Sequence, residues 1–261
     1  MIGGVPWRWG PCVASGLLHA LAFNLTFFVQ ELFLVVPKAL TPGLRPTLFH
    51  NNHTWEGDNP LAALFQGTGV LAILVSGLLC ATAVRRAHHR PAIALLLIWM
   101  AFNGAFQALP QIVIGAMHPG SDVGMAFGYL ELGTAARVIL AGAALAAMPF
   151  VGLWVARQVL ALLDATTPHA AAIARIVTIP ACLAIALIVA FRVPRELVEV
   201  LAPPIVVTVV GTGCVQAVSR HVRHVVHRGG FSSISPTGPA IALAVLWLFF
   251  HLVLRPGIQF Q

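Results

Sequence analysis

Charged residues are what this sequence has least of. Only 9% of its 261 residues are Asp, Glu, Lys or Arg, and only eight are acidic. A soluble domain carries about 25% charged residues, which keep its surface hydrated. Here 59% of the residues are hydrophobic and the mean hydropathy is +0.89. The scarcity of charge therefore excludes an ordinary soluble protein and indicates that a lipid bilayer surrounds the chain.

Lysine is almost absent, since Lys38 stands alone beside fourteen arginines. We expect Lys38 to lie in a loop, so no span offers a lysine that could bind retinal. The net charge of +7 would suggest nucleic acid in a soluble protein. The arginines fall mostly between apolar runs, however, where the positive-inside rule explains them. We therefore expect the lipid bilayer, and no nucleic acid, as a partner.

Cysteine is also scarce. The four cysteines, Cys12, Cys80, Cys182 and Cys214, all fall within apolar runs, and none belongs to a CxxC pair. This pattern is typical of small packing residues and not of disulfides or metal ligands.

Long apolar runs recur along the whole chain, each near the length needed to cross a hydrocarbon core of about 30 Å. The sequence predicts an all-α, polytopic transmembrane helix bundle of about seven spans, with six to eight as the range. The predicted spans are Cys12–Val36, Leu61–Val84, Pro91–Met117, Thr134–Ala156, Ile176–Phe191, Leu197–Val218 and Pro239–Leu254.

The arginines also predict the orientation. With the N-terminus inside, nine arginines fall on the inner side and five basic residues on the outer side. This bias predicts an N-in, C-out protein of the inner (plasma) membrane. We further expect residues 1–156, with outer loops 37–60 and 118–133, to form a polar-centred subdomain of four spans. Residues 157–261 would then form an apolar scaffold of three spans.

Several polar residues lie inside the first four spans, where they are costly and usually face the bundle interior. Glu31 and Arg137 are predicted to pair and are the candidate catalytic residues. Candidate binding residues are Gln66 and an amide ladder at i, i+4 and i+8 on one helix face, formed by Asn103, Gln107 and Gln111. The alternative interpretation is a buried ion pair and amide hydrogen bonds that only hold the bundle together.

A candidate metal site lies in the first outer loop. His50 and His53 stand three residues apart beside Glu56, and Asp122 in the second outer loop could complete the set. Imidazole and carboxylate groups suit a divalent metal such as zinc. The alternative is a solvated loop in which Asn and Asp residues form turns.

The stretch around His19 is faintly similar to site-2-type membrane metalloproteases, which carry HExxH on a helix. Here Ala20 occupies the position of the essential Glu and Phe23 that of the second His. Because the motif is missing, the protease activity is not carried over.

Three function classes remain open. The first is a membrane-embedded, metal-dependent enzyme that uses the outer His and Asp residues. The second is a transporter of a small molecule or ion that uses Glu31, Arg137 and the amide ladder, although no internal repeat supports it. The third is a non-catalytic subunit with a membrane-protein partner, and a homo-oligomer is also possible.

Overall fold

The computed structural model describes residues 9–163, 169–223 and 225–260. Within these residues, seven helical segments are long and apolar enough to cross a membrane, which confirms the predicted all-α bundle. They are Trp9–Ala39, Leu61–Ala87, Pro91–Met117, Thr134–Ala161, His169–Arg192, Leu197–Ser219 and Thr237–Leu254. The chain is therefore an integral membrane protein that contacts the bilayer through these spans.

Three of these seven spans are built from more than one helical element. The elements are α1 (Trp9–Ala39), α2 (Leu61–Phe65), α3 (Thr68–Ala87), α4 (Pro91–Met117), α5 (Asp122–Tyr129), α6 (Thr134–Ala161), α7 (His169–Ile173), π-helix η1 (Ala174–Thr178), α8 (Ile179–Arg192), α9 (Leu197–Ser219), 3-10 helix η2 (Phe231–Ser233), α10 (Thr237–Phe249) and π-helix η3 (Phe250–Leu254). The short helix α5 lies between α4 and α6 and does not span.

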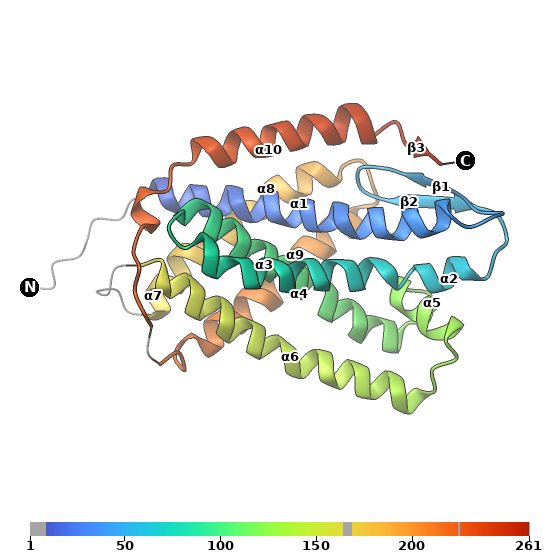
Figure 1. Ribbon diagram of the computed structural model, residues 1–261, viewed down its shortest axis with the longest axis horizontal. Coiled ribbons are helices and arrows are strands. Elements are labelled where there is room, and N and C mark those ends of the chain that lie inside the picture. Colours follow the sequence, from blue (N-terminus) through green and yellow to red (C-terminus); the bar gives the residue numbers. More distant parts are fainter. Residues whose placement is uncertain (1–8, 164–168, 224, 261) are drawn as a thin grey trace, which may run out of the picture.

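The long helices run side by side along the long axis of the molecule, as Figure 1 shows. Helix α1 packs against α3, α4, α8 and α10, while α6 packs against α4 and α9. Helices of the two predicted subdomains thus share one bundle, and the division after residue 156 stays a prediction. The predicted N-in orientation likewise stays a prediction.

Helices α3 and α4 approach closely because glycines face each other. A Cβ atom on Gly104 would lie 2.6 Å from the Ile73 carbonyl oxygen and 2.8 Å from Gly77 Cα. No larger side chain fits there without moving the two backbones apart. Small residues at such contacts are typical of helix packing in membranes, where apolar burial gives little preference for a helix over lipid.

One end of the bundle carries a small antiparallel sheet where the sequence predicts only a loop. Strands β1 (Arg45–Leu48) and β2 (His53–Glu56) form a hairpin, and β3 (Ile258–Gln259) pairs with the other edge of β1. The sheet was missed because its strands are short and β3 lies about 200 residues away along the chain. We call this the hairpin end; the orientation rule predicts that it lies outside.

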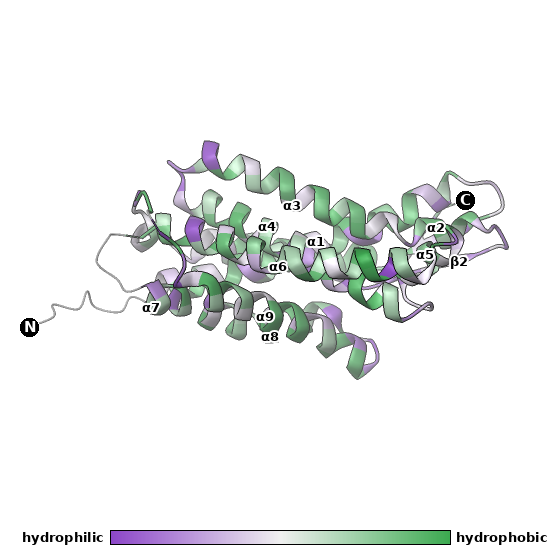
Figure 2. Cartoon of the chain, turned by 90° about the horizontal axis from the view of Figure 1, so that it is seen from below, coloured by the Kyte–Doolittle hydropathy of each residue, from purple (hydrophilic) through white to green (hydrophobic). Residues whose placement is uncertain are grey.

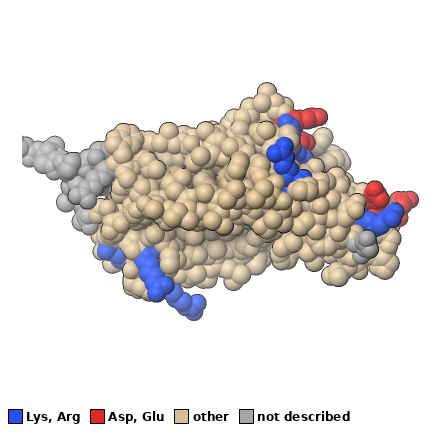
Figure 3. All heavy atoms as spheres, turned by 90° about the horizontal axis from the view of Figure 1, so that it is seen from above, with Lys and Arg blue, Asp and Glu red and all other residues tan. Residues whose placement is uncertain are grey.

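Apolar and charged residues are distributed as expected for a protein that contacts both lipid and water. Figure 2 shows mainly apolar residues along the long helices. On the face in Figure 3, charged groups gather toward the two ends, and the acidic groups in view lie only toward the hairpin end. This end therefore brings together both signs of charge, as a polar site requires.

Replacing Gly104 by Ala tests the α3–α4 contact. We expect the added methyl group to lower the melting temperature in detergent, because overpacking a tight contact costs about 1–3 kcal/mol. Gly142→Ala is the matched control, since nothing lies within 4 Å of a Cβ atom there. Equal melting temperatures for the two variants would contradict the observed packing.

Candidate functional site

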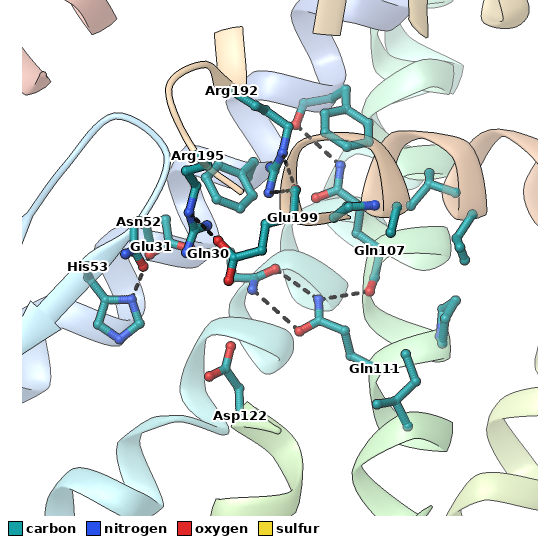
Figure 4. A pocket seen from close by; sticks show the side chains of 18 of the residues that line it. Gln30, Glu31, Asn52, His53, Gln107, Gln111, Asp122, Arg192, Arg195 and Glu199 are labelled. Atoms are coloured by element: carbon teal, nitrogen blue, oxygen red, sulfur yellow. Dashed lines mark hydrogen bonds and ion pairs between the residues drawn. The ribbon is translucent and has the colours of Figure 1, made fainter. Parts of the chain in front are cut away.

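A cavity of about 550 Å³ lies at the hairpin end of the bundle. Its walls come from α1, β2, α4, α5, α8 and α9 (Figure 4), and Phe23, Phe27 and Phe106 are among its apolar residues. Its polar residues are Gln30, Glu31, Asn52, His53, Gln66, Gln107, Gln111, Asp122, Arg192, Arg195 and Glu199. The cavity thus combines amides with charges of both signs in a bundle that is otherwise apolar.

The hairpin and α1 meet through a buried ion pair. His53 Nδ1 lies 2.7 Å from Glu31 Oε2, and both side chains are more than 90% buried. The other ring nitrogen, Nε2, lies 3.1 Å from Gln66 Oε1. Lys38 Nζ lies 3.5 Å from the same Nε2, so both nitrogens of the His53 ring have buried partners.

Lys38 reinforces this pair from the end of α1. It was expected in a loop, but it lies in the last helical turn and is fully buried. Its Nζ donates to the Leu34 carbonyl oxygen at 2.9 Å and to Gln66 Oε1 at 3.1 Å, and it lies over the Trp55 ring. The long side chain folds back along the helix, which sequence reading did not anticipate.

The amide ladder lines the cavity in part. Gln107 and Gln111 lie one turn apart on α4, and Gln111 Nε2 donates to the Gln107 carbonyl oxygen at 2.9 Å and to Gln30 Oε1 at 3.0 Å. Gln107 Nε2 donates to the Phe23 carbonyl oxygen. These bonds join α4 to α1 and leave amide groups facing the cavity (Figure 4).

Asn103 lies one turn deeper than the cavity and is fully buried. Its Nδ2 donates to the Trp99 carbonyl oxygen at 2.9 Å and lies 3.2 Å from His19 Nδ1. Two atoms of this pair, Asn103 Oδ1 and His19 Nε2, have no hydrogen-bond partner among the described residues. A buried polar atom without a partner is uncommon and costs free energy. The two unpartnered atoms therefore mark a place on the α1–α4 contact where water or a ligand could bind.

Asp122 enters the cavity from the first turn of α5. Burial raises the pKa of its carboxyl group, and the nearby Glu31 carboxylate raises that pKa further. His53, Lys38 and Arg195 act in the opposite direction. A carboxyl group whose pKa is raised holds its proton to higher pH, so Asp122 can serve as a proton donor or acceptor beside Glu31.

Two arginines form the wall opposite α5. Arg195 Nε lies 2.7 Å from Glu199 Oε2 in an ion pair. Arg192 is 4% exposed, stacks over the Phe27 ring and donates from Nε and Nη2 to the Glu199 carbonyl oxygen. Its Nη1 has no partner among the described residues. The cavity wall therefore holds a buried guanidinium with one free donor.

The predicted ion pair between Glu31 and Arg137 is wrong. In the described part of the chain, Glu31 pairs with His53, and Arg137 Nε donates to the Leu132 carbonyl oxygen at 2.8 Å. Arg137 does not line the cavity. The reason is its place in the first turn of α6, where it closes the connection from α5.

The four predicted metal ligands also do not meet. Alternation along β2 places the buried His53 and the half-buried Trp55 on one side and leaves Thr54 and Glu56 exposed on the other. Glu56 consequently pairs with Arg45 in solvent, at 3.5 Å. His50 lies in the turn before β2 and does not line the cavity. Among the described residues, no three His, Cys, Asp or Glu side chains are placed to hold one metal ion.

The structure thus brings together Glu31, His53, Gln66, Gln107, Gln111 and Asp122. It leaves out Arg137, His50, Glu56 and Asn103. Sequence reasoning missed Arg192, Arg195 and Glu199 as site residues, since the two arginines were counted only among the basic residues of the outer side. Their clustering at the junction of two spans, in the stretch 192–199, was the signal that could have found them.

Separate and joint replacement of Glu31 and His53 tests the buried pair. We expect His53→Leu and Glu31→Leu each to lower the free energy of unfolding by about 3–5 kcal/mol, because each leaves a buried charge unpaired. The double variant should lose less than the sum of the two. Unfolding in detergent measures this, with the exposed Arg45–Glu56 pair as the control: Glu56→Gln should cost less than about 1 kcal/mol. Additive losses would contradict the pairing.

Asp122→Asn tests the raised pKa. In the folded protein the protonated Asp122 contributes stability that is present below the usual aspartate pKa and lost as pH rises through the raised one. Asn cannot ionise, so the variant should match the parent in melting temperature near pH 4 and exceed it near pH 8. The exposed Asp58→Asn is the control, and it should shift neither value. A variant that is less stable at the higher pH would contradict this account.

Comparison of the chain with models of protein families, with curated proteins and with solved structures finds no match. What the protein does must therefore be argued from the cavity itself.

Proposed function

We propose that this membrane protein is a carrier for a small polar solute with a carboxylate or similar anionic group, which enters through the hairpin end. The observation that carries the proposal is Arg192: a buried guanidinium in the cavity wall whose Nη1 has no partner among the described residues. A buried charged donor is costly unless an acceptor meets it, and a planar guanidinium suits a carboxylate. The proposed location is the inner (plasma) membrane.

The rest of the cavity suits a solute that also carries neutral or cationic groups. Gln107 and Gln111 offer amide groups on one wall, and Asp122 and Glu199 offer carboxylates on the others. Its volume of about 550 Å³ lies within the range of about 300–1,000 Å³ typical of small-molecule sites. Glu31 belongs to this site through its pair with His53, and Gln66 contacts the other ring nitrogen of His53.

Transport is favoured over simple binding by the contact between α1 and α4 beneath the cavity. Polar side chains continue there toward the other end of the bundle, through Asn103 and His19 to Trp99 and Ser15. Intramembrane polar groups commonly mark the path of a solute or ion. The unpartnered atoms Asn103 Oδ1 and His19 Nε2 would gain partners if this contact opened to water or solute.

A membrane-embedded enzyme is the second candidate. It is supported by the carboxylate–imidazole pair of Glu31 and His53, which lies beside the protonatable Asp122 and fits general acid–base chemistry. The metal-dependent form of this proposal would need ligands beyond His53 that the described residues do not group around it. Both nitrogens of His53 already have hydrogen-bond partners, and this favours the carrier.

Uptake into proteoliposomes tests the carrier. After a thermal-shift screen of small carboxylates, amino acids and dicarboxylates, the labelled hit should accumulate in vesicles that hold the full chain. Arg192→Lys keeps the charge but loses the planar fork, and we expect it to weaken binding about 10- to 100-fold, because a hydrogen bond to a charged group contributes about 1.5–3 kcal/mol.

Arg137→Gln is the matched control, because it removes an arginine outside the cavity, and uptake should remain as in the parent. Chemical conversion of the hit, followed by mass spectrometry, would favour the enzyme. Equal loss in the two arginine variants would contradict the role of Arg192.

A further inference from the structure

Two histidines whose imidazole rings lie close together are found outside the cavity. His50 is in the turn of the hairpin, and His251 is in the π-helical turn η3 that ends the last span. The two ring centroids lie 5.5 Å apart at an interplanar angle of 45°. The fold therefore brings together two histidines that are about 200 residues apart in sequence, at the place where the hairpin meets α10.

Backbone carbonyl groups fix the tautomer of each ring. His50 Nε2 lies 3.3 Å from the Val193 carbonyl oxygen, and His251 Nδ1 lies 3.0 Å from the Trp247 carbonyl oxygen. Because a carbonyl oxygen only accepts, each of these nitrogens carries the hydrogen. In neutral imidazoles the lone pairs are then left on His50 Nδ1 and His251 Nε2.

Of these two nitrogens, His50 Nδ1 gives the stronger evidence for a bound ligand. The side chain is 5% exposed, and Nδ1 has no partner in the part of the chain that the structure describes. A buried polar atom without a partner is uncommon, so His50 Nδ1 marks a place where a ligand is expected.

This arrangement matches what a metal ion requires of its histidine ligands. A metal-binding histidine commonly donates its other ring N–H to a backbone carbonyl group, which fixes its tautomer and orientation. An ion about 2 Å from each coordinating nitrogen places two imidazole centroids roughly 4.5–6 Å apart, which includes the observed separation. Single π-helical turns such as η3 also occur frequently at functional sites.

We propose that His50 and His251 are the two protein ligands of a transition-metal ion, with water completing its coordination. Copper is the ion expected to bind most tightly, since Cu²⁺ exceeds Ni²⁺ and Zn²⁺ in affinity for nitrogen ligands. The nearby cations do not exclude it: Arg195 is paired with Glu199, and Arg255 is exposed to solvent. The bound ion would join the hairpin to the last span.

Metal titration of the purified full chain, free of any affinity tag, tests this site. We expect one equivalent of Cu²⁺ to bind more tightly than Zn²⁺ or Ni²⁺. The electron paramagnetic resonance spectrum should show coupling to imidazole nitrogens. Binding should also raise the melting temperature, because the ion binds the folded state.

His50→Gln and His251→Gln should each lower the affinity for Cu²⁺ by at least about 100-fold, because each removes a ligand. Removal of a group that only hydrogen-bonds to a ligand typically costs roughly 10- to 100-fold. Gln can still donate to the Val193 carbonyl oxygen, so the hairpin turn should be retained, and circular dichroism checks the fold. His251→Gln gives a second, independent variant on another element.

The matched control is His88→Gln with His89→Gln, a ring pair 5.7 Å apart at the other end of the bundle. This double variant should bind Cu²⁺ as the parent does. Absence of Cu²⁺ binding in the parent would overturn the proposal. Parent-like affinity in both His50→Gln and His251→Gln would also overturn it.

Discussion

The contact between Glu31 and His53 is the interaction on which the hairpin end depends. A carboxylate more than 90% buried in a bundle surrounded by lipid must have a partner, because the low dielectric makes an unpaired charge very costly. Here the partner comes from a strand and not from another span. The pair consequently holds β2 over the end of α1, and this places Trp55, Gln66 and Lys38 around it. The cavity exists because the sheet is held at this point.

The spans were predictable because hydropathy is a local property. Twenty consecutive apolar residues identify a membrane helix without knowledge of its neighbours. The sheet was not predictable in this way, since β1 pairs on one side with the nearby β2 and on the other with Ile258–Gln259. Its strands are too short for alternation to be recognised. The residues that face the cavity from the hairpin follow from the register of those strands, and this explains why His53 belongs to the site and Glu56 does not.

The choice of partners was the least predictable part of the site. The sequence identified Glu31 as a buried acid that requires a cation, but several cations were available. Arg137 was chosen because it was the cation within a predicted span, whereas the structure uses His53 from a presumed loop. Arg192 was missed because a charge at the end of a span usually reaches water, and here it turns into the bundle. The rotation of each helix about its axis decides which charged side chains come together. An apolar span has no amphipathic face from which this rotation could be inferred.

The pairing of β3 with β1 has a consequence for the order in which the molecule can be assembled. Residues 45–48 leave the ribosome early, but Ile258–Gln259, which complete the sheet, come more than 200 residues later. Domains and elements that are made first generally fold first during synthesis. In this protein the hairpin must wait, with one edge open, until the seventh span has entered the bilayer. Insertion of that span and completion of the sheet are therefore linked steps.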